Sequence, residues 1–470
     1  MKRALLLSAV SLLALTACAS EVGPQSSGIE PPSFWSRLTG SGAPSALGAP
    51  LAGGPEVQVQ HDWWKRFNDP TLETLVAEAL AGNKTLAIAK ARVEEARANR
   101  GAARAAQFPQ IGIAGNASRA NQGVASNDKV LNVAEADLEA SWEIDLFGQN
   151  RARTAEARAI LESEDDARQG VMVGLLAEVA RTYFDLRNNE RQIALTRRNL
   201  ETQQQTFALI QAQQRGDMAS DFDVQRAGAR VSATAAIIPT LESARDAALN
   251  RLNVLLGVPP GTRDALVASP RDLAPLDPRI LVAAPAAVLA ARPDVRAAER
   301  RFAASISASE AATAELFPKI SLTALFGIQN STLFASATPW GIGASLVQPV
   351  LNFGLIRAQI DAADARQTQA FLNYQETVLE ALENMENGLS AYLHEAGRNA
   401  ALATAVAQNS RATDLARQQY SSGYTGLLDL LVAQRDLLEA EASRAASDYA
   451  LRKSLVTIYA AAGGGWRDQP

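Results

Sequence analysis

The sequence has very little of what a catalytic or metal-binding protein uses. Its 470 residues include one cysteine, Cys18, and two histidines, His61 and His394, which lie far apart in the chain. A single cysteine excludes an intramolecular disulfide and a metal site built on several thiolates. No phosphate-binding glycine loop or nucleophile elbow is present. We therefore predict a protein that is not an enzyme, binds no cofactor or metal, and takes any energy from a partner.

Charge and hydropathy exclude two further classes. The formal net charge is −5, or −7 once Lys2 and Arg3 are removed, and acidic and basic residues are mixed along the chain. No basic surface for nucleic acid is expected. Beyond the N-terminal segment no apolar run reaches the roughly 18 residues of a membrane helix. A membrane crossing would therefore have to use strands.

The N-terminus predicts where in the cell the protein is located. Residues 1–17 have the basic start and short apolar core of a secretory signal peptide. The segment Leu15-Thr16-Ala17-Cys18 resembles a bacterial lipobox, in which the cysteine is lipidated and becomes the first mature residue, and Ala19 after it fits outer-membrane sorting. An ordinary signal peptide with an incidental cysteine is the alternative. Residues 18–55, rich in proline and glycine, are expected to form an extended tether.

The rest of the chain repeats itself at an offset of about 206 to 209 residues, which indicates an internal duplication. Three landmarks recur in the same order: Phe108-Pro109 and Phe317-Pro318, Phe147-Gly148 and Phe353-Gly354, and Gly216 to Asp223 and Gly423 to Asp429. We predict a first structural repeat at 56–257, an inter-repeat linker in the equatorial region at 258–290, a second repeat at 291–462 and a C-terminal tail at 463–470.

Each repeat is expected to contain a long helical hairpin. Between Gly148 and Arg215 there is no proline, and the second repeat has a matching run from Leu355 to Tyr420. A return helix follows each run, at 221–256 and 427–462. Apolar residues recur every seventh position, which favours coiled-coil packing: Met172, Val179, Leu186, Ile193, Leu200 and Phe207, then Val378, Met385, Tyr392 and Val406. Asn399 and Thr413 interrupt the second series. Arg187, next to this seam, is expected to be exposed.

Four segments have the period of a strand, near 110–122, 130–146, 319–330 and 340–352. In 137–146 apolar residues alternate with polar ones, which is typical of a strand with one oily and one wet face. A soluble sheet capping the helices is the alternative to membrane strands. Because four strands cannot close a membrane barrel of about eight or more, several chains would have to share one, and three chains would supply twelve strands.

At this point the sequence resembles the TolC-type outer membrane factor family, in its lipoprotein branch that includes NodT and the drug-efflux channels. The motifs that carry the resemblance are Trp142 to Gly148, Arg292 to Val295, Phe317 to Leu322, and Gly423 to Asp429. It covers about Trp63 to Ala462. The resemblance implies a mainly α-helical homotrimer, in which duplicated coiled-coil hairpins form a periplasmic tunnel and each chain gives four strands to a shared twelve-stranded barrel in the outer membrane.

The resemblance also implies partners and sites. In that family the channel docks a periplasmic adaptor, or membrane fusion protein, and an inner-membrane pump, here of the resistance-nodulation-division type. The docking tips correspond to the turns after the long helices, namely Arg215, Gly216, Asp217, Met218, Tyr420, Gly423, Tyr424 and Thr425. Turns without a docking role are the alternative.

A candidate gate follows from the same family pattern. Asp429 matches the first acidic position of the family's constriction, but Val432 stands where many members carry a second acid. A ring of Asp429 would favour cations locally, whereas an ordinary first-turn acid, favoured by the helix dipole, is the alternative.

We therefore expect an outer membrane channel of a tripartite efflux system, giving drugs, toxic compounds or signalling molecules an exit duct. A structural periplasm-spanning coiled-coil lipoprotein and a channel for type I protein secretion are the alternatives.

Overall fold

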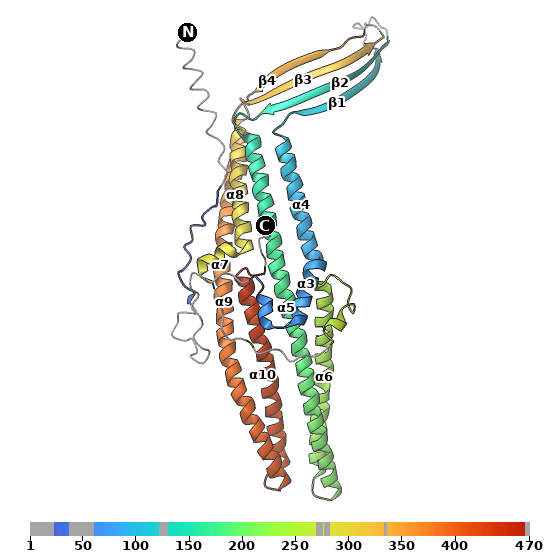
Figure 1. Ribbon diagram of the computed structural model, residues 1–470, viewed down its shortest axis with the longest axis vertical. Helices are drawn as coiled ribbons and strands as arrows, with labels where there is room; N and C mark the ends of the chain where they lie inside the picture. The colour runs from blue at the N-terminus through green and yellow to red at the C-terminus, as the bar shows by residue number, and fades with distance from the viewer. Residues whose placement is uncertain are drawn as a thin grey trace. The chain divides into compact units, whose positions relative to one another are not determined.

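The computed structural model describes residues 23–36, 61–121, 130–268, 276, 283–332 and 336–465 (Figure 1). Cys18, the signal peptide and most of the predicted tether lie outside these residues. In chain order the elements are η3 (Trp63–Phe67), α3 (Pro70–Gly82), α4 (Lys84–Ala105), β1 (Gln110–Asn121), β2 (Val130–Ile144), α5 (Gln149–Arg215), α6 (Asp221–Leu255), η5 (Asp264–Leu266), α7 (Pro285–Ala291), α8 (Pro293–Ala314), β3 (Lys319–Ser331), β4 (Trp340–Val347), α9 (Phe353–Ser421) and α10 (Leu427–Ala461).

The order of elements repeats, as the duplicated sequence predicts. Two short or medium helices, two strands, a long helix and a return helix occur first as α3 to α6 and again as α7 to α10. The long helices α5 and α9 contain 67 and 69 residues. The fourth strand ends at Val347, earlier than expected, close to Pro349, which cannot donate to a strand ladder. No described helix is apolar over enough of its length to cross a membrane.

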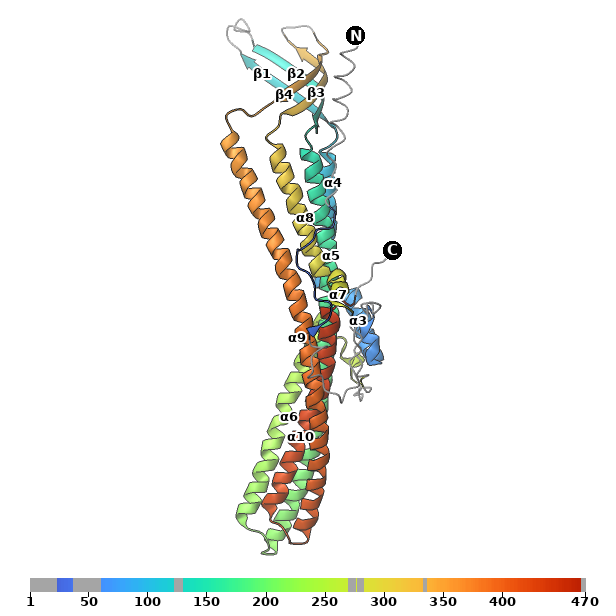
Figure 2. The same cartoon turned by 90° about the vertical axis from the view of Figure 1, so that its left-hand side faces the viewer.

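Two compact units each draw on both repeats. The first contains Lys90–Asp166 and Arg296–Thr377, which hold the sheet and the adjoining helix segments. In it α4 contacts α5, where the Thr154 hydroxyl donates to the Ala103 carbonyl (3.3 Å), and α5 contacts α8, where the Ser163 hydroxyl donates to the Ala297 carbonyl (3.0 Å). The Ser309 hydroxyl of α8 in turn donates to Asp364 of α9. These helix segments form a row in the order α4, α5, α8, α9 (Figure 2).

The second unit is helical and contains most of the buried core. It includes Glu30–Ala89, Ala167–Val295 and Val378–Pro470. Asp69 caps the start of α3, because its carboxylate accepts from the backbone N–H groups of Thr71 and Leu72. Trp63 is buried and stacks on Tyr459 of α10, with ring centroids 5.9 Å apart, so it anchors the segment before α3 to the helical core.

The seam prediction is confirmed in the middle of α5 and wrong for Arg187, while Met172, Leu200 and Phe207 are half-buried. Leu186 and Ile193 are buried, but so is Arg187, at 2% exposure. Its guanidinium donates to Glu190 (2.8 Å), to the Val267 carbonyl (3.0 Å) and to the Tyr183 hydroxyl (3.1 Å). A heptad count identifies only the residues that face one partner helix. Here the segment that contains Val267 covers the neighbouring face of α5 as well.

The two repeats join their helices by equivalent contacts. At the α3–α4 junction the Asn83 amide donates to the Leu255 carbonyl at the end of α6 (2.8 Å). At the α7–α8 junction the Arg292 guanidinium donates to the Ala461 carbonyl at the end of α10 (2.8 Å). Both bonds satisfy a carbonyl of the last helical turn, which has no partner within its own helix. Different side chains therefore perform the same task in the two repeats.

Candidate functional site

The sheet has one apolar and one polar face. The strands are antiparallel in the order β1-β2-β3-β4. Residues paired across neighbouring strands share a face, and the rows Ile113–Leu138–Phe326–Trp340 and Ile111–Ala140–Ala324–Ile342 are apolar. On the opposite face Gly112, Glu139 and Leu325 form a row, followed by Gln110, Ser141 and Thr323. The alternation predicted from the sequence is therefore confirmed, and Leu325 is the exception that blurs it.

The apolar face is uncovered in the single chain. Ile113, Ile342 and Trp340 are 85%, 82% and 75% exposed. A contiguous patch of this kind marks a surface that contacts lipid or another protein. A hollow of about 740 Å³ is lined by residues of both faces, with Glu139, Ser141 and Thr323 from the polar face and Ile111, Ala324 and Ile342 from the apolar face. The two-faced sheet suits a wall with lipid on one side and water on the other.

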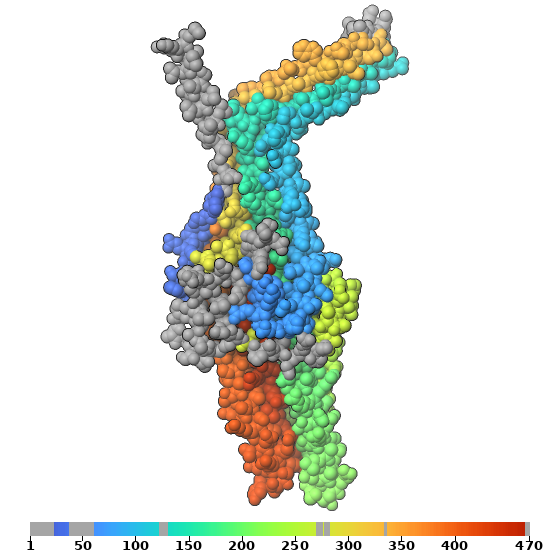
Figure 3. Space-filling view, in the orientation of Figure 1, coloured from blue at the N-terminus to red at the C-terminus, as the bar shows by residue number. Residues whose placement is uncertain are grey.

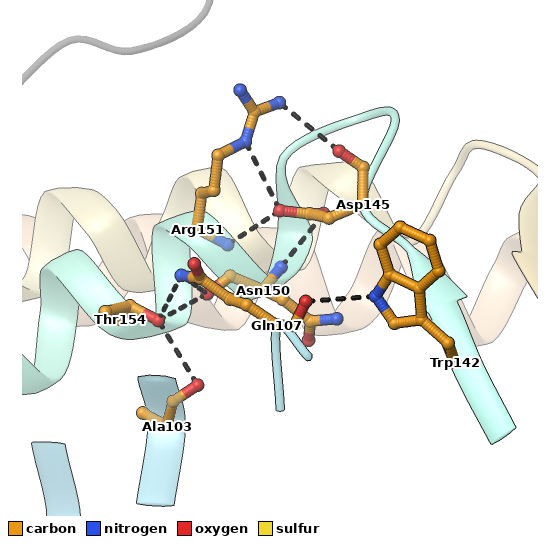
Figure 4. Close-up of polar contacts among 7 residues, drawn as sticks. All are labelled: Ala103, Gln107, Trp142, Asp145, Asn150, Arg151 and Thr154. Atoms are coloured by element: carbon orange, nitrogen blue, oxygen red, sulfur yellow. Dashed lines mark hydrogen bonds and ion pairs between the residues drawn. The ribbon is translucent and has the colours of Figure 1, made fainter. Parts of the chain in front are cut away.

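A network of polar contacts fixes the joint between the sheet and the helices (Figure 4). The Asp145 carboxylate accepts from the backbone N–H groups of Asn150 (3.1 Å) and Arg151 (2.8 Å), so it caps the start of α5. The Trp142 indole donates to the Gln107 carbonyl (3.0 Å), and the Gln107 amide donates to the Thr154 hydroxyl (2.7 Å). The motif Trp142 to Gly148 thus sets the change from strand to helix.

The second repeat makes a matching contact with another residue type. Gln348 occupies the place of Trp142, and its amide donates to the Leu316 carbonyl (3.0 Å). Phe147 and Phe317, from landmarks of different repeats, stack with centroids 4.8 Å apart. The landmarks that revealed the duplication therefore meet at this joint.

The first hairpin tip turns at Asp217. Asp217 has a φ of 56°, in the left-handed region, whereas Gly216 does not. Aspartate also tolerates that conformation, so this reversal does not depend on the glycine. The Met218 N–H closes the turn on the Gln213 carbonyl (2.8 Å), and both Arg215 and Met218 are exposed. A capping box of Ser220 and Asp223 then starts α6.

The second tip does turn at a glycine. Gly423 has a φ of +76°. Tyr424 after it is 85% exposed, while Thr425 is half-buried. Asp429 lies exposed in the first turn of α10, and Val432, one turn later, is half-buried. His394 is exposed on α9.

The two tips are connected to each other, which the sequence did not reveal. The Tyr420 hydroxyl donates to the Gln213 side chain (2.7 Å), and below it Ile210, Ala227, Leu427 and Leu431 form a small core. Burial raises the pKa of Tyr420, and the charge of Asp223 raises it further. Figure 3 shows the hairpins α5–α6 (green) and α9–α10 (orange to red) side by side. The one sequence signal for this contact is that Gln213 and Tyr420 each lie three residues before the glycine of their tip.

These features define a membrane-channel class of protein, and the comparisons agree. The chain belongs to the outer membrane efflux protein family, whose model matches residues 75–258 and 284–464. The protein is accordingly an outer membrane channel for efflux that extends into the periplasm.

Individual relatives cover nearly the whole chain. Nodulation protein T of Rhizobium leguminosarum bv. trifolii is 30% identical, over 86% of this chain and 88% of that protein. The pyoverdine export outer membrane protein OpmQ of Pseudomonas putida is 30% identical, over 97% of each. Among solved structures, the outer-membrane channel OprN is similar with a TM-score of 0.85 and 31% identity, over 95% of this chain and all of that one.

Proposed function

We propose that the protein is the homotrimeric outer-membrane channel of a tripartite efflux system, docked to a periplasmic adaptor and an inner-membrane pump. The observation that carries the proposal is the two-faced sheet with open edges. β1 and β4 are edge strands, and a lipid-facing sheet cannot leave its edges unpaired. A chain with four such strands needs further copies of itself to close a barrel.

The helices support a head-to-tail ring. In the first unit the row of helices runs α4, α5, α8, α9, so its two ends are different surfaces. In the second unit α6 contacts α5 through Arg251 and Glu178, α5 contacts α10 through Gln192, and α10 contacts α9 through Asp448 and Asn399. Unlike ends pair head to tail, and such contacts close into rings. Three copies would give twelve strands and twelve helices.

Mass and conductance test the assembly. Extracts in mild detergent should contain a particle of about three times the 49.9 kDa chain, less its signal peptides. Reconstituted into planar bilayers, this particle should form pores. A monomer would contradict the shared barrel, and a trimer that never conducts would point to a structural lipoprotein instead.

Asp429 is the proposed gate residue, because a ring of three carboxylates at a narrow point concentrates cations. Asp429→Asn should lower the preference for cations in bilayer recordings. Glu439→Gln removes the same charge from an exposed position on the same helix and is the matched control. An equal effect of both variants would show that overall charge, not a ring at Asp429, sets the preference.

The tips are the proposed adaptor-docking surface: Arg215, Gly216, Asp217 and Met218 on one hairpin, and Tyr420, Gly423, Tyr424 and Thr425 on the other. Gly423 is a poor place for a test, because its φ of +76° strains any larger residue. Met218 and Tyr424 are 76% and 85% exposed. Met218→Asp with Tyr424→Asp should abolish export while leaving the amount of trimer and its conductance unchanged. Export at the normal level would show that docking uses another surface.

Cys18 is the proposed lipidation site, since it directly follows the predicted signal peptide and is the only cysteine. Labelling with a palmitate analogue should mark the natural protein and fail for Cys18→Ser. Equal labelling of both would remove the lipid anchor from the proposal. The proposed division of the chain into signal peptide, tether, first repeat, linker, second repeat and C-terminal tail remains 1–17, 18–55, 56–257, 258–290, 291–462 and 463–470.

A further inference from the structure

The first unit contains a basic groove that the sheet and the tips do not explain. The groove has a volume of about 510 Å³ and lies among α5, α8 and α9. Small residues of α8, including Ala304, Ala308 and Ala312, line it, so α8 is recessed between its neighbours. Ile160 of α5 adds an exposed apolar side chain.

Arginines from all three helices surround this groove. Arg153 lies on α5, Arg301 on α8 and Arg366 on α9. Arg153 makes a 3.4 Å ion pair with Glu315. Arg301 and Arg366 are exposed, and among the described residues neither has an ion pair or hydrogen bond. Two guanidinium groups are thus free to bind an anion.

The groove and the N-terminal segment lie on opposite faces of the α8–α9 pair. The backbone N–H of Gln25 donates to Glu299 of α8 (2.8 Å), and Gln375 of α9 donates to the Ser27 carbonyl (2.9 Å). Arg301 is two residues beyond Glu299, about 200° around the helix. Arg366 is nine residues before Gln375, or about two and a half turns.

The position of the N-terminal segment indicates which face of the α8–α9 pair lines the channel interior. If Cys18 carries a lipid, that lipid lies in the bilayer outside the barrel, and the five residues to Gly23 span at most about 18 Å. The segment at residues 23–29 then lies on the outer surface, and the groove opens to the lumen. This step rests on the proposed function.

We propose that the groove is a weak binding site, inside the channel, for small amphipathic carboxylates and sulfonates. The two unpaired guanidinium groups would hold the acid group through paired N–H donors, and the alanine floor with Ile160 would contact the apolar part. Binding must be weak enough for release, because a conducting channel requires that solutes leave. Glu156 lies in the same groove and opposes anions when ionised.

Equilibrium dialysis of the detergent-solubilised protein with naphthalenesulfonate tests the site, with protein-free micelles as the background. The natural protein should bind this anion more tightly than naphthalenemethanol, which is neutral. Arg301→Gln with Arg366→Gln should weaken anion binding about tenfold. Arg357→Gln is the matched control, because Arg357 is exposed on α9 and half a turn out of phase with Arg366, and it should change nothing.

Two further variants separate the site from a general effect on folding. Ala308→Phe fills the groove and should abolish anion binding. Glu156→Gln removes a negative charge and should strengthen anion binding about two- to threefold. Equal binding of the anion and the neutral compound, or an unchanged affinity in the double arginine variant, would overturn the inference. If the natural protein binds the anion but forms no pores in planar bilayers, the result would instead count against the proposed function.

Discussion

The long helices α5 and α9 occupy the same place in their repeats, yet they bury different chemistry. α5 presents Tyr183, Arg187 and Glu190 where α9, 206 residues later, presents Leu389, Leu393 and Ala396. Tyr183 also donates to Asp69 (2.5 Å) at the start of α3, and burial followed by that bond raises its pKa. Later in the two helices the polar residues are in α9 and the apolar ones in α5, because Asn399 and Thr413 of α9 stand where α5 has Ile193 and Phe207.

The comparison teaches that the duplicated fold tolerates polar or apolar contacts at equivalent positions, and the polar side chains at these positions have partners. Asn399 donates to Asp448 of α10 (2.7 Å), and the Thr413 hydroxyl proton is shared between the Ala433 carbonyl of α10 (3.0 Å) and the Asn409 carbonyl of α9 (2.8 Å). The polar residues that interrupt the heptad in α9 therefore form hydrogen bonds that connect α9 to α10. Buried polar groups without partners would cost more than the contacts return.

Leu186→Asp should have the largest effect, because Leu186 is fully buried in the main core of the second unit. Placing an unpaired charge there should cost about 3 kcal/mol or more. The measurement is the midpoint of thermal unfolding by circular dichroism at fixed protein concentration. Ala194→Asp, at an exposed site on the same helix, should cost about 0.7 kcal/mol. Similar midpoints for the two variants would show that this face of α5 is not buried.

Arg187→Leu should cost about 3 kcal/mol, because it leaves Glu190, Tyr183 and the Val267 carbonyl without their donor. Copying the second repeat completely, with Tyr183→Leu, Arg187→Leu and Glu190→Ala together, should recover a large part of that loss. Chemical denaturation of the single and triple variants decides the point. A triple variant less stable than the single one would mean that the polar network is specifically required at this place.

Asn399→Ala should cost about 1 to 2.4 kcal/mol. Losing a hydrogen bond to the charged Asp448 costs about 1.5 to 3 kcal/mol, and the better helix propensity of alanine returns about 0.6 kcal/mol. Gln408→Ala, at an exposed position on the same helix, is the control. Equal unfolding midpoints would show that the seam of α9 tolerates Asn399 without using it.

Thr413→Val should have the smallest effect, about 0.5 kcal/mol, since it removes one neutral hydrogen bond and keeps the size of the side chain. Hydrogen exchange at the α9–α10 contact should detect the local change even where the unfolding midpoint does not move. Unchanged exchange there would mean that the hydroxyl contributes nothing between these helices.

Much of the fold could be predicted because its signals are local. The absence of proline over 67 residues predicted α5, and strict alternation predicted the two faces of the sheet. The candidate site was predicted less completely. Neither the bond between Tyr420 and Gln213 nor the groove with Arg301 and Arg366 has a local pattern, because each joins residues distant in sequence.

The sequence by itself determined the duplication, the order and length of the elements, and the class of protein, because periodicity and helix-breaking residues act within a few turns of chain. Only the tertiary structure decided that Arg187 is buried, that Asp217 rather than Gly216 makes the first turn, and that Arg301 and Arg366 border one groove. Burial depends on which second element covers a face, and that choice is made by packing between segments far apart in the chain.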